Sequence, residues 1–151
     1  MERIVLTDKS SWYKGPWQTE ADLVRWMDFL TGYPCIIARD TNSGAWAGYV
    51  GISYNHPLYH TYVADPTFQY VSIHGGVSYA GFLPKQELSI TPAQRRWWIG
   101  FDCMQEFDLC PLKIDDEPVD ARIEYRTEEY AQNETMYLAE QLEQMEGNQD
   151  D

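Results

Sequence analysis

In two stretches of this chain, hydrophobic residues recur every three or four positions, and each stretch predicts a helix. Between Thr19 and Leu30, apolar side chains recur every three or four residues, behind an N-cap threonine and ahead of Gly32. This spacing predicts an amphipathic N-terminal helix. A second stripe, starting near Thr127, predicts a long C-terminal helix, and its members are Ala131, Thr135, Leu138, Leu142 and Met145.

Shorter runs rich in β-branched and aromatic residues predict strands. They lie at 3–6, 35–39, 45–53, 68–73, 77–82 and 95–102, and the alternating segment 121–126 indicates an edge strand or an extended stretch. Residues 40–44 predict a hairpin loop, and 84–92 a longer loop. Gly48 and Gly51 interrupt the 45–53 run, which indicates a place where something packs tightly on the backbone.

This order of elements predicts an α+β fold. We expect a mainly antiparallel sheet of about five strands, with the N-terminal helix and the long C-terminal helix packed on it. The chain has no internal repeat and no linker-like stretch, so we expect a single domain over 1–146 and a frayed acidic tail over 147–151.

The charge of the chain narrows the classes of partner. It has 24 acidic and 11 basic residues, which gives a net charge of −13. Such a field repels phosphate backbones, so direct nucleic-acid binding is disfavoured. The acidic residues form either a solvated surface or a surface that mimics a nucleic acid or docks on a basic partner. Glu128, Glu129 and Glu134 are the candidate partner-binding residues, and Asp115–Glu117, Glu140 and Glu143 add to the acidic surface.

The cysteines and the hydropathy pattern point to the cytoplasm. Cys35, Cys103 and Cys110 include no paired CxxC spacing, and reduced thiols are the default in a cytosolic protein. No apolar run approaches 18 residues, and the first residues lack a signal-peptide core. We therefore expect a cytoplasmic protein that does not insert into a membrane.

Candidate chemistry centres on two segments. His74 precedes Gly75 and Gly76, so a turn can present its ring beside backbone N–H groups, although a turn histidine can equally bond a neighbouring carbonyl. Asp102 and Cys103 end a very apolar run, where a general base and a nucleophile are often mounted. If the protein is an enzyme, His74, Asp102 and Cys103 are the candidate catalytic residues. The other reading is a capping Asp and a buried, inert Cys.

Ligand binding draws on a wider set of residues. The candidates are His56, His74, Gly75, Gly76, Asp102 and Asp108. His56 and His60 are four residues apart, but Pro57 argues against a helical metal pair, so we assign no metal ligands. Whether a cofactor or a metal ion binds is left open. The aromatic residues form either a core or a pocket for a planar ligand, and they are Trp12, Trp17, Trp46, Tyr49, Tyr54, Tyr59 and Tyr62.

Three segments carry a resemblance to a known family. HGGVSYAG at 74–81, WWIGFDC at 97–103 and LAEQL at 138–142 resemble motifs of an uncharacterised family of small bacteriophage and prophage proteins. That family has an HGG-[LIV]-[TS]-[YF]-x-G segment, a WWxGFDCxHxxD-like segment and a C-terminal helix. The resemblance spans roughly 45–142 and implies a source more than a reaction. This chain has Gln105 where such proteins often have a histidine, which puts in doubt any site that needs that histidine.

These observations favour two functions. The first is a phage-type accessory protein of the host-interaction or anti-defence kind, which binds a host protein through its acidic surface or a small molecule near His74 and Asp102. The alternative is a small hydrolase or transferase that uses His74, Asp102 and Cys103. A structural component of the virion is a third possibility, and the oligomeric state is left open.

Overall fold

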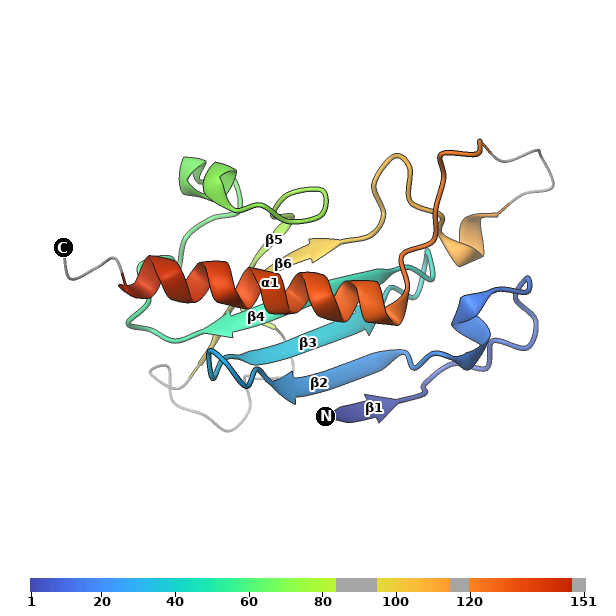
Figure 1. Ribbon diagram of the computed structural model, residues 1–151, viewed down its shortest axis with the longest axis horizontal. Coiled ribbons are helices and arrows are strands. Elements are labelled where there is room, and N and C mark those ends of the chain that lie inside the picture. The colour runs from blue at the N-terminus through green and yellow to red at the C-terminus, as the bar shows by residue number, and fades with distance from the viewer. Residues whose placement is uncertain (84–94, 115–119, 148–151) are drawn as a thin grey trace.

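The computed structural model describes residues 1–83, 95–114 and 120–147, which form one six-stranded antiparallel sheet with a long helix across one face (Figure 1). The sheet order is β1-β2-β3-β4-β6-β5. The strands are β1 (Glu2–Ile4), β2 (Leu23–Met27), β3 (Pro34–Arg39), β4 (Trp46–Ile52), β5 (Tyr79–Gly81) and β6 (Trp97–Asp102). The α+β class is therefore confirmed, with six strands in place of about five.

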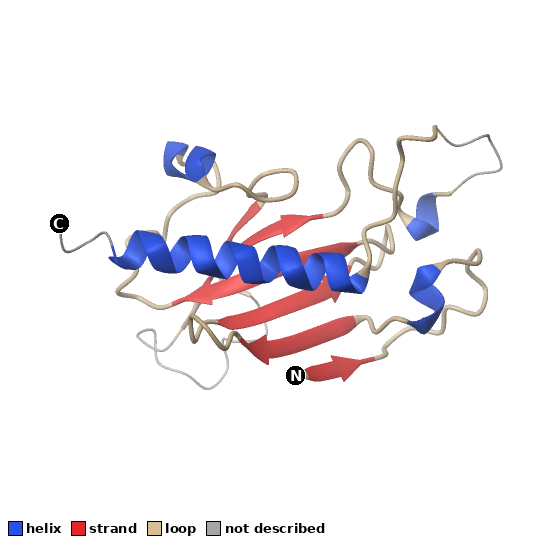
Figure 2. Ribbon diagram, in the orientation of Figure 1, coloured by secondary structure: helices blue, strands red, loops and turns tan. Residues whose placement is uncertain are grey.

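The helix α1 (Glu128–Gly147) lies over β3 and β4 (Figure 2). Its residues Ala131, Leu138 and Leu142 face the sheet and are fully buried, in one core cluster with Ile37 and Val50. Gly48 lets the helix approach closely, because a Cβ there would lie 2.3 Å from Thr135 Oγ1. The expected close packing on the backbone of β4 is thus present.

The sheet presents a second face on the side away from α1. Strand alternation turns Ile36, Tyr49 and Trp98 to this side, where they line a shallow hollow of about 740 Å³. The two faces differ because even-numbered residues of β4 point to the helix and odd-numbered ones away from it.

The predicted N-terminal helix is wrong. Residues 23–27 form β2, which pairs with β1 and β3, and only a short 3-10 turn (Pro16–Thr19) precedes it. Val24 and Trp26 point to the helix side, and Arg25 and Met27 to the other, so the residues that look helical by spacing alternate as a strand. Pairing with two strands outweighed the local helical pattern.

Two further strand predictions need correction. The first residues of the run 68–73 belong to a 3-10 turn (Pro66–Tyr70), and β5 pairs with β6 instead of with that run. Segment 121–126 makes only an isolated bridge, between Asp108 and Glu124. Another 3-10 turn spans Pro111–Lys113. The predicted 84–92 loop, Asp115–Glu117 and residues 148–151 of the tail lie outside the described residues.

The sequence predicts that the chain does not insert into a membrane, and the helices of the structure bear on this prediction. In the part of the chain that the structure describes, no helix is both long enough and apolar enough to cross a membrane.

Candidate functional site

His74 is held by a tight turn that packs on the segment after β6. Gly75 and Gly76 have φ angles of 68° and 79°, which favour glycine. A Cβ on Gly75 would lie 2.5 Å from the Gln105 side chain, so this turn admits no larger residue without movement. The predicted turn is confirmed. Packing and a positive φ both favour glycine at Gly75, and the positive φ alone favours it at Gly76.

The imidazole of His74 bridges two groups. Its Nε2 lies 2.7 Å from Asp108 Oδ2, and its Nδ1 lies 2.7 Å from the Tyr130 hydroxyl. An ionised carboxylate only accepts, so a neutral ring carries its proton on Nε2, and Nδ1 then accepts from Tyr130. The side chain of His74 is only 12% exposed, which fixes the ring in this orientation.

Asp108 lies at the centre of the cluster. Its side chain is 2% exposed and accepts hydrogen bonds from His74, from Arg126 Nε at 3.1 Å and from the backbone N–H of Gln105 at 3.0 Å. A buried carboxylate needs such partners, because an unpaired buried charge is costly. The loop that follows β6 and the segment that precedes α1 are joined here.

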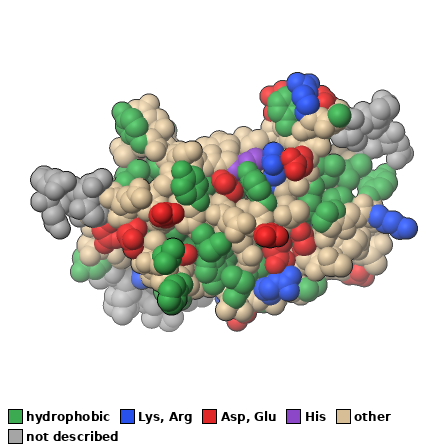
Figure 3. Space-filling model, in the orientation of Figure 1, with side chains coloured by type: hydrophobic (Ala, Val, Ile, Leu, Met, Phe, Trp, Pro, Cys, Tyr) green, Lys and Arg blue, Asp and Glu red, His purple; other side chains and the backbone are tan. Residues whose placement is uncertain are grey.

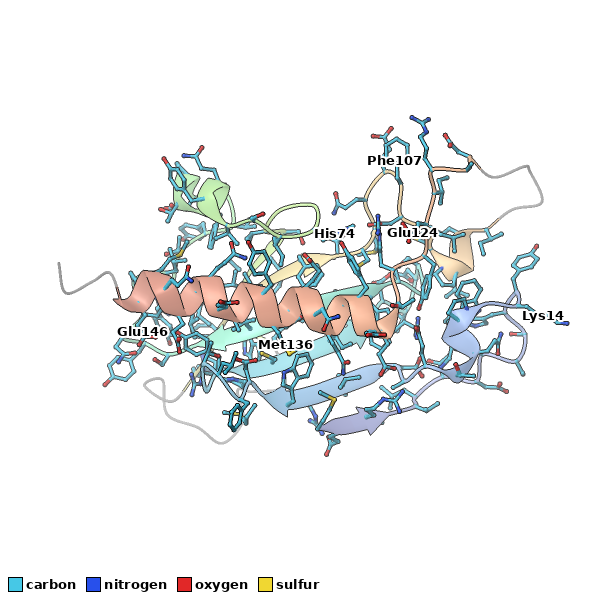
Figure 4. The ribbon with its side chains drawn as sticks, viewed as in Figure 1. Lys14, His74, Phe107, Glu124, Met136 and Glu146 are labelled. Carbon is cyan, nitrogen blue, oxygen red and sulfur yellow. The ribbon has the colours of Figure 1, made fainter. Side chains whose placement is uncertain are left out.

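The helix supplies the rest of the cluster. Tyr130 packs edge-on against the His74 ring and lies under the Arg126 guanidinium, and Glu134 accepts from the His74 backbone N–H at 2.9 Å. Burial raises the pKa of Tyr130, with a contribution from Glu134, so its hydroxyl keeps its proton. Figure 4 shows His74 and Glu124 on the same side of α1.

Asp102 does not belong to this cluster. Ile99, Phe101 and Cys103 point into the core below α1, so Asp102 points to the opposite face, where it lines a hollow of about 370 Å³ with Tyr49 and Tyr79. The structure thus contradicts the prediction that His74 and Asp102 line one cavity. The two are linked only indirectly, because Gln105 bonds Asp102 with its side chain and Asp108 with its backbone.

Cys103 is placed as a core residue. It is 1% exposed, and burial raises the pKa of its thiol, an effect that Asp108 and Asp102 reinforce. A thiol held in its protonated form is a poor nucleophile. Burial also raises the pKa of Cys35, to about 12, and that of Cys110, and none of the three cysteines forms a disulfide. The candidate catalytic triad is not assembled.

The other two histidines have separate roles. His56 is buried, and its ring bonds the Leu142 carbonyl at 2.7 Å and the Leu58 backbone N–H at 3.0 Å. His60 is exposed and stacks on Tyr59. Within the described ranges, no group of three or more His, Cys, Asp or Glu side chains is arranged to hold a metal ion.

The candidate partner-binding residues divide into two kinds. Glu128 accepts from Arg3 and from the Ala21 backbone, which lowers its pKa, and Glu134 is bonded to His74. Glu129 is exposed on the outer side of α1. Of the three, only Glu129 is exposed, and Glu128 and Glu134 are partly buried.

The aromatic candidates are likewise spread over the molecule. Trp17 and Trp46 are buried, and Tyr54 and Tyr62 are largely exposed. Tyr49 belongs to the face away from α1. These residues do not line a common pocket for a planar ligand.

A second buried polar cluster was not predicted. Arg39, 3% exposed in its side chain, bonds Asp22, Glu20 and Tyr125, and Lys9 bonds Asp22 at 2.7 Å. Burial alone would raise the pKa of Asp22, but its hydrogen bonds from Lys9 and from backbone N–H groups lower it. The only feature of the sequence that could have indicated this cluster is the position of charged residues, such as Arg39, next to apolar ones. Since its charges are paired, the cluster has a structural role, in which it holds the N-terminal segment against the start of α1.

Comparison of the chain with protein-family models, with curated proteins and with solved structures gives no match. The structure itself shows a His74–Asp108 cluster whose polar groups are bonded to one another, a candidate triad that is not assembled, and an exposed face of α1 rich in carboxylates.

Proposed function

We propose that this chain is a phage-type accessory protein that acts by binding a host protein through the outer face of α1. The observation that carries the proposal is the mixed character of that face. Glu129, Glu140 and Glu143 are exposed there, next to Met136 and Tyr137, which are 38% and 46% exposed. Figure 3 shows acidic and hydrophobic side chains side by side over this part of the surface.

The physical reasoning uses two properties of interfaces. Exposed aromatic and methionine side chains gain free energy when a partner buries them. Carboxylates beside them speed association with a basic partner and weaken association with an acidic one. The resemblance to phage and prophage proteins supports a partner that belongs to the bacterial host.

The alternative, a hydrolase or transferase, gains no favourable observation. His74 bonds Asp108 and Tyr130 instead of Asp102, and Cys103 is buried as a thiol. A reaction at His74 would first have to displace one of these partners.

The proposal is tested by capture from a bacterial lysate on the immobilised protein, followed by mass spectrometry. We expect the wild type to retain a host protein at near-stoichiometric amounts, and less of it as NaCl rises from about 0.05 to about 0.5 M. The variant Glu129→Lys/Glu140→Lys/Glu143→Lys should lose it.

A matched control carries the same change in charge elsewhere. Asp8, Glu106 and Asp120 are exposed and lie outside α1, so Asp8→Lys/Glu106→Lys/Asp120→Lys should retain the host protein. Capture of no protein, or equal capture by both triple variants, would overturn the proposal.

A further inference from the structure

A groove runs between α1 and the turn that connects β2 to β3. It encloses about 540 Å³, and its lining includes Trp26, Phe29, Leu30, Met136, Tyr137 and Glu140. The groove exists because α1 covers β3 and β4 but does not extend over β2, so the helix side of β2 is left partly open (Figure 1).

The turn holds two apolar side chains outward. Phe29 is 97% exposed and Leu30 is 80% exposed. The backbone beneath them is fixed, because Asp28 accepts from the N–H and the hydroxyl of Thr31 at 3.0 Å and 2.7 Å. A preorganised turn loses little entropy on binding, so exposed apolar groups on it are suited to contact a partner.

The opposite wall of the groove is one stripe of α1. Asn133, Met136, Tyr137 and Glu140 follow the i, i+3, i+4, i+7 spacing and are all exposed. Seven residues of helix span about 10 Å, so the wall is two turns long. Figure 4 shows Met136 on the side of α1 that faces β2.

The charge of the groove restricts what can occupy it. Met1 also lines it, and the two charged side chains in its lining, Asp28 and Glu140, are both acidic. Asp28 is buried and bonded to Thr31, so Glu140 supplies the exposed charge, and no Lys or Arg lines the groove among the described residues.

We infer that this groove receives an amphipathic helix of a partner protein, with leucine-like side chains on one face and Lys or Arg beside them. The apolar face would cover Phe29, Leu30 and Met136, and a basic side chain would reach Glu140. This is the helix-in-groove mode, in which anchors at i, i+3, i+4 and i+7 enter one apolar channel. The inference rests on the proposed function for the existence of a host partner and adds the chemistry of that partner.

The test uses a designed probe in place of the unknown partner. It is a 14-residue peptide with Leu at i, i+3, i+4 and i+7 positions and Lys elsewhere, and its binding to the full chain is measured by fluorescence anisotropy. A scrambled peptide of the same composition and a peptide with Glu in place of Lys serve as controls. We expect binding by the Leu/Lys peptide, and at least tenfold weaker binding by the other two.

Variants locate the binding. Phe29→Ser/Leu30→Ser should weaken the peptide at least tenfold, and Glu140→Lys should weaken it more at low salt than at high salt. Tyr62→Ser/Tyr70→Ser removes two equally exposed aromatic residues far from the groove and should leave binding unchanged. Since all these side chains are exposed, circular dichroism should report unchanged folding.

Several outcomes would overturn the inference: no binding of the Leu/Lys peptide at millimolar concentration, equal binding of the three peptides, or indifference to the Phe29/Leu30 change. Self-association through these same two residues, measured by light scattering, would assign the groove to a second copy instead. Lysate capture that depends on Glu129 and Glu143, together with failure of the peptide, would leave the proposed function standing without the groove. Peptide binding without any captured host protein would support the groove as a helix-binding site and overturn the proposed function.

Discussion

His74 joins three parts of the chain that are far apart in sequence. Its backbone N–H bonds Glu134, and its ring bonds Tyr130 on α1 and Asp108 in the loop after β6. The residue therefore fixes the glycine turn to the helix and to that loop. All three hydrogen bonds are made within the protein. We therefore expect that substituting one of the bonded side chains lowers the stability of the fold.

The Tyr130 hydroxyl offers a clean measure of this cluster. Tyr130→Phe removes the partner of His74 Nδ1 and should lower the free energy of unfolding by about 1–2 kcal/mol. Tyr137→Phe is the matched control, since Tyr137 is exposed on the same helix and should change stability by less than about 0.5 kcal/mol. Urea denaturation of the three proteins measures both effects. Equal stability of the two variants would contradict the role of the cluster.

His56 gives a prediction about pH. Burial lowers its pKa below 6.5, and its neutral ring both accepts from Leu58 N–H and donates to the Leu142 carbonyl. The unfolded chain then binds the proton at higher pH than the folded one, so stability is fully present above about pH 6.5 and is lost as pH falls through the folded pKa.

The experiment compares wild type with His56→Gln by urea denaturation between about pH 7.5 and pH 5.5, above the range in which most carboxylates titrate. We expect the wild type to lose stability as pH falls, and the less stable variant to show a flatter profile. His60→Gln, a change at an exposed histidine, should follow the wild type. Parallel profiles for wild type and His56→Gln would show that His56 does not cause the loss.

At the scale of elements, local patterns predicted α1, β3, β4 and β6. The buried residues of α1 recur at helical spacing and those of β3 alternate, whereas β4 and β6 are apolar runs buried along nearly their whole length. The local pattern failed for β2, since Leu23, Trp26, Met27 and Leu30 fit a helical stripe and the strand is selected by pairing with β1 and β3. Pairing is non-local, so no window of this segment contains the signal.

The candidate site shows the same limit. His74 and Asp108 were both recognised as ligand candidates, because a histidine before two glycines is a local feature and Asp108 is the last acidic position of the WWxGFDCxHxxD-like segment. Their partners Tyr130 and Arg126 lie 56 and 18 residues away from them, and nothing local marks them. The error with Asp102 has a simple cause, in that an end-of-strand residue faces one side or the other by a single step of register.

The contact between α1 and β4 supports a prediction at this scale. Gly48→Ala would place a Cβ 2.3 Å from Thr135 Oγ1 and 2.6 Å from Phe101, so it should destabilise the protein by about 1–3 kcal/mol through overpacking. Gly51→Ala is the control on the other face of the same strand, where the nearest atoms are 3.1 Å away. In thermal unfolding, the melting temperature of Gly48→Ala should lie well below that of Gly51→Ala. The reverse order would mean that the helix does not approach β4 this closely.

At the scale of the whole molecule, the charges divide into two populations. Arg39, Lys9 and Asp22 form buried pairs whose side chains are only 3–4% exposed. The chain has a net charge of −13, and exposed carboxylates among the described residues, such as Glu129, Glu140 and Glu143, repel one another. Salt screens exposed charges far more than buried pairs, so the two populations respond differently to ionic strength.

This difference predicts that NaCl stabilises the protein. Raising NaCl from about 0.02 to about 0.5 M should reduce repulsion among the exposed carboxylates, with little effect on the buried pairs around Arg39. A gain of about 1 kcal/mol would raise the melting temperature by about 2–4 °C for a chain of this length. Differential scanning calorimetry measures the shift. The Glu129→Lys/Glu140→Lys/Glu143→Lys variant, with less charge to screen, should gain less than the wild type. A melting temperature that falls with NaCl, or an equal rise in both proteins, would mean that surface repulsion does not limit the stability of the fold.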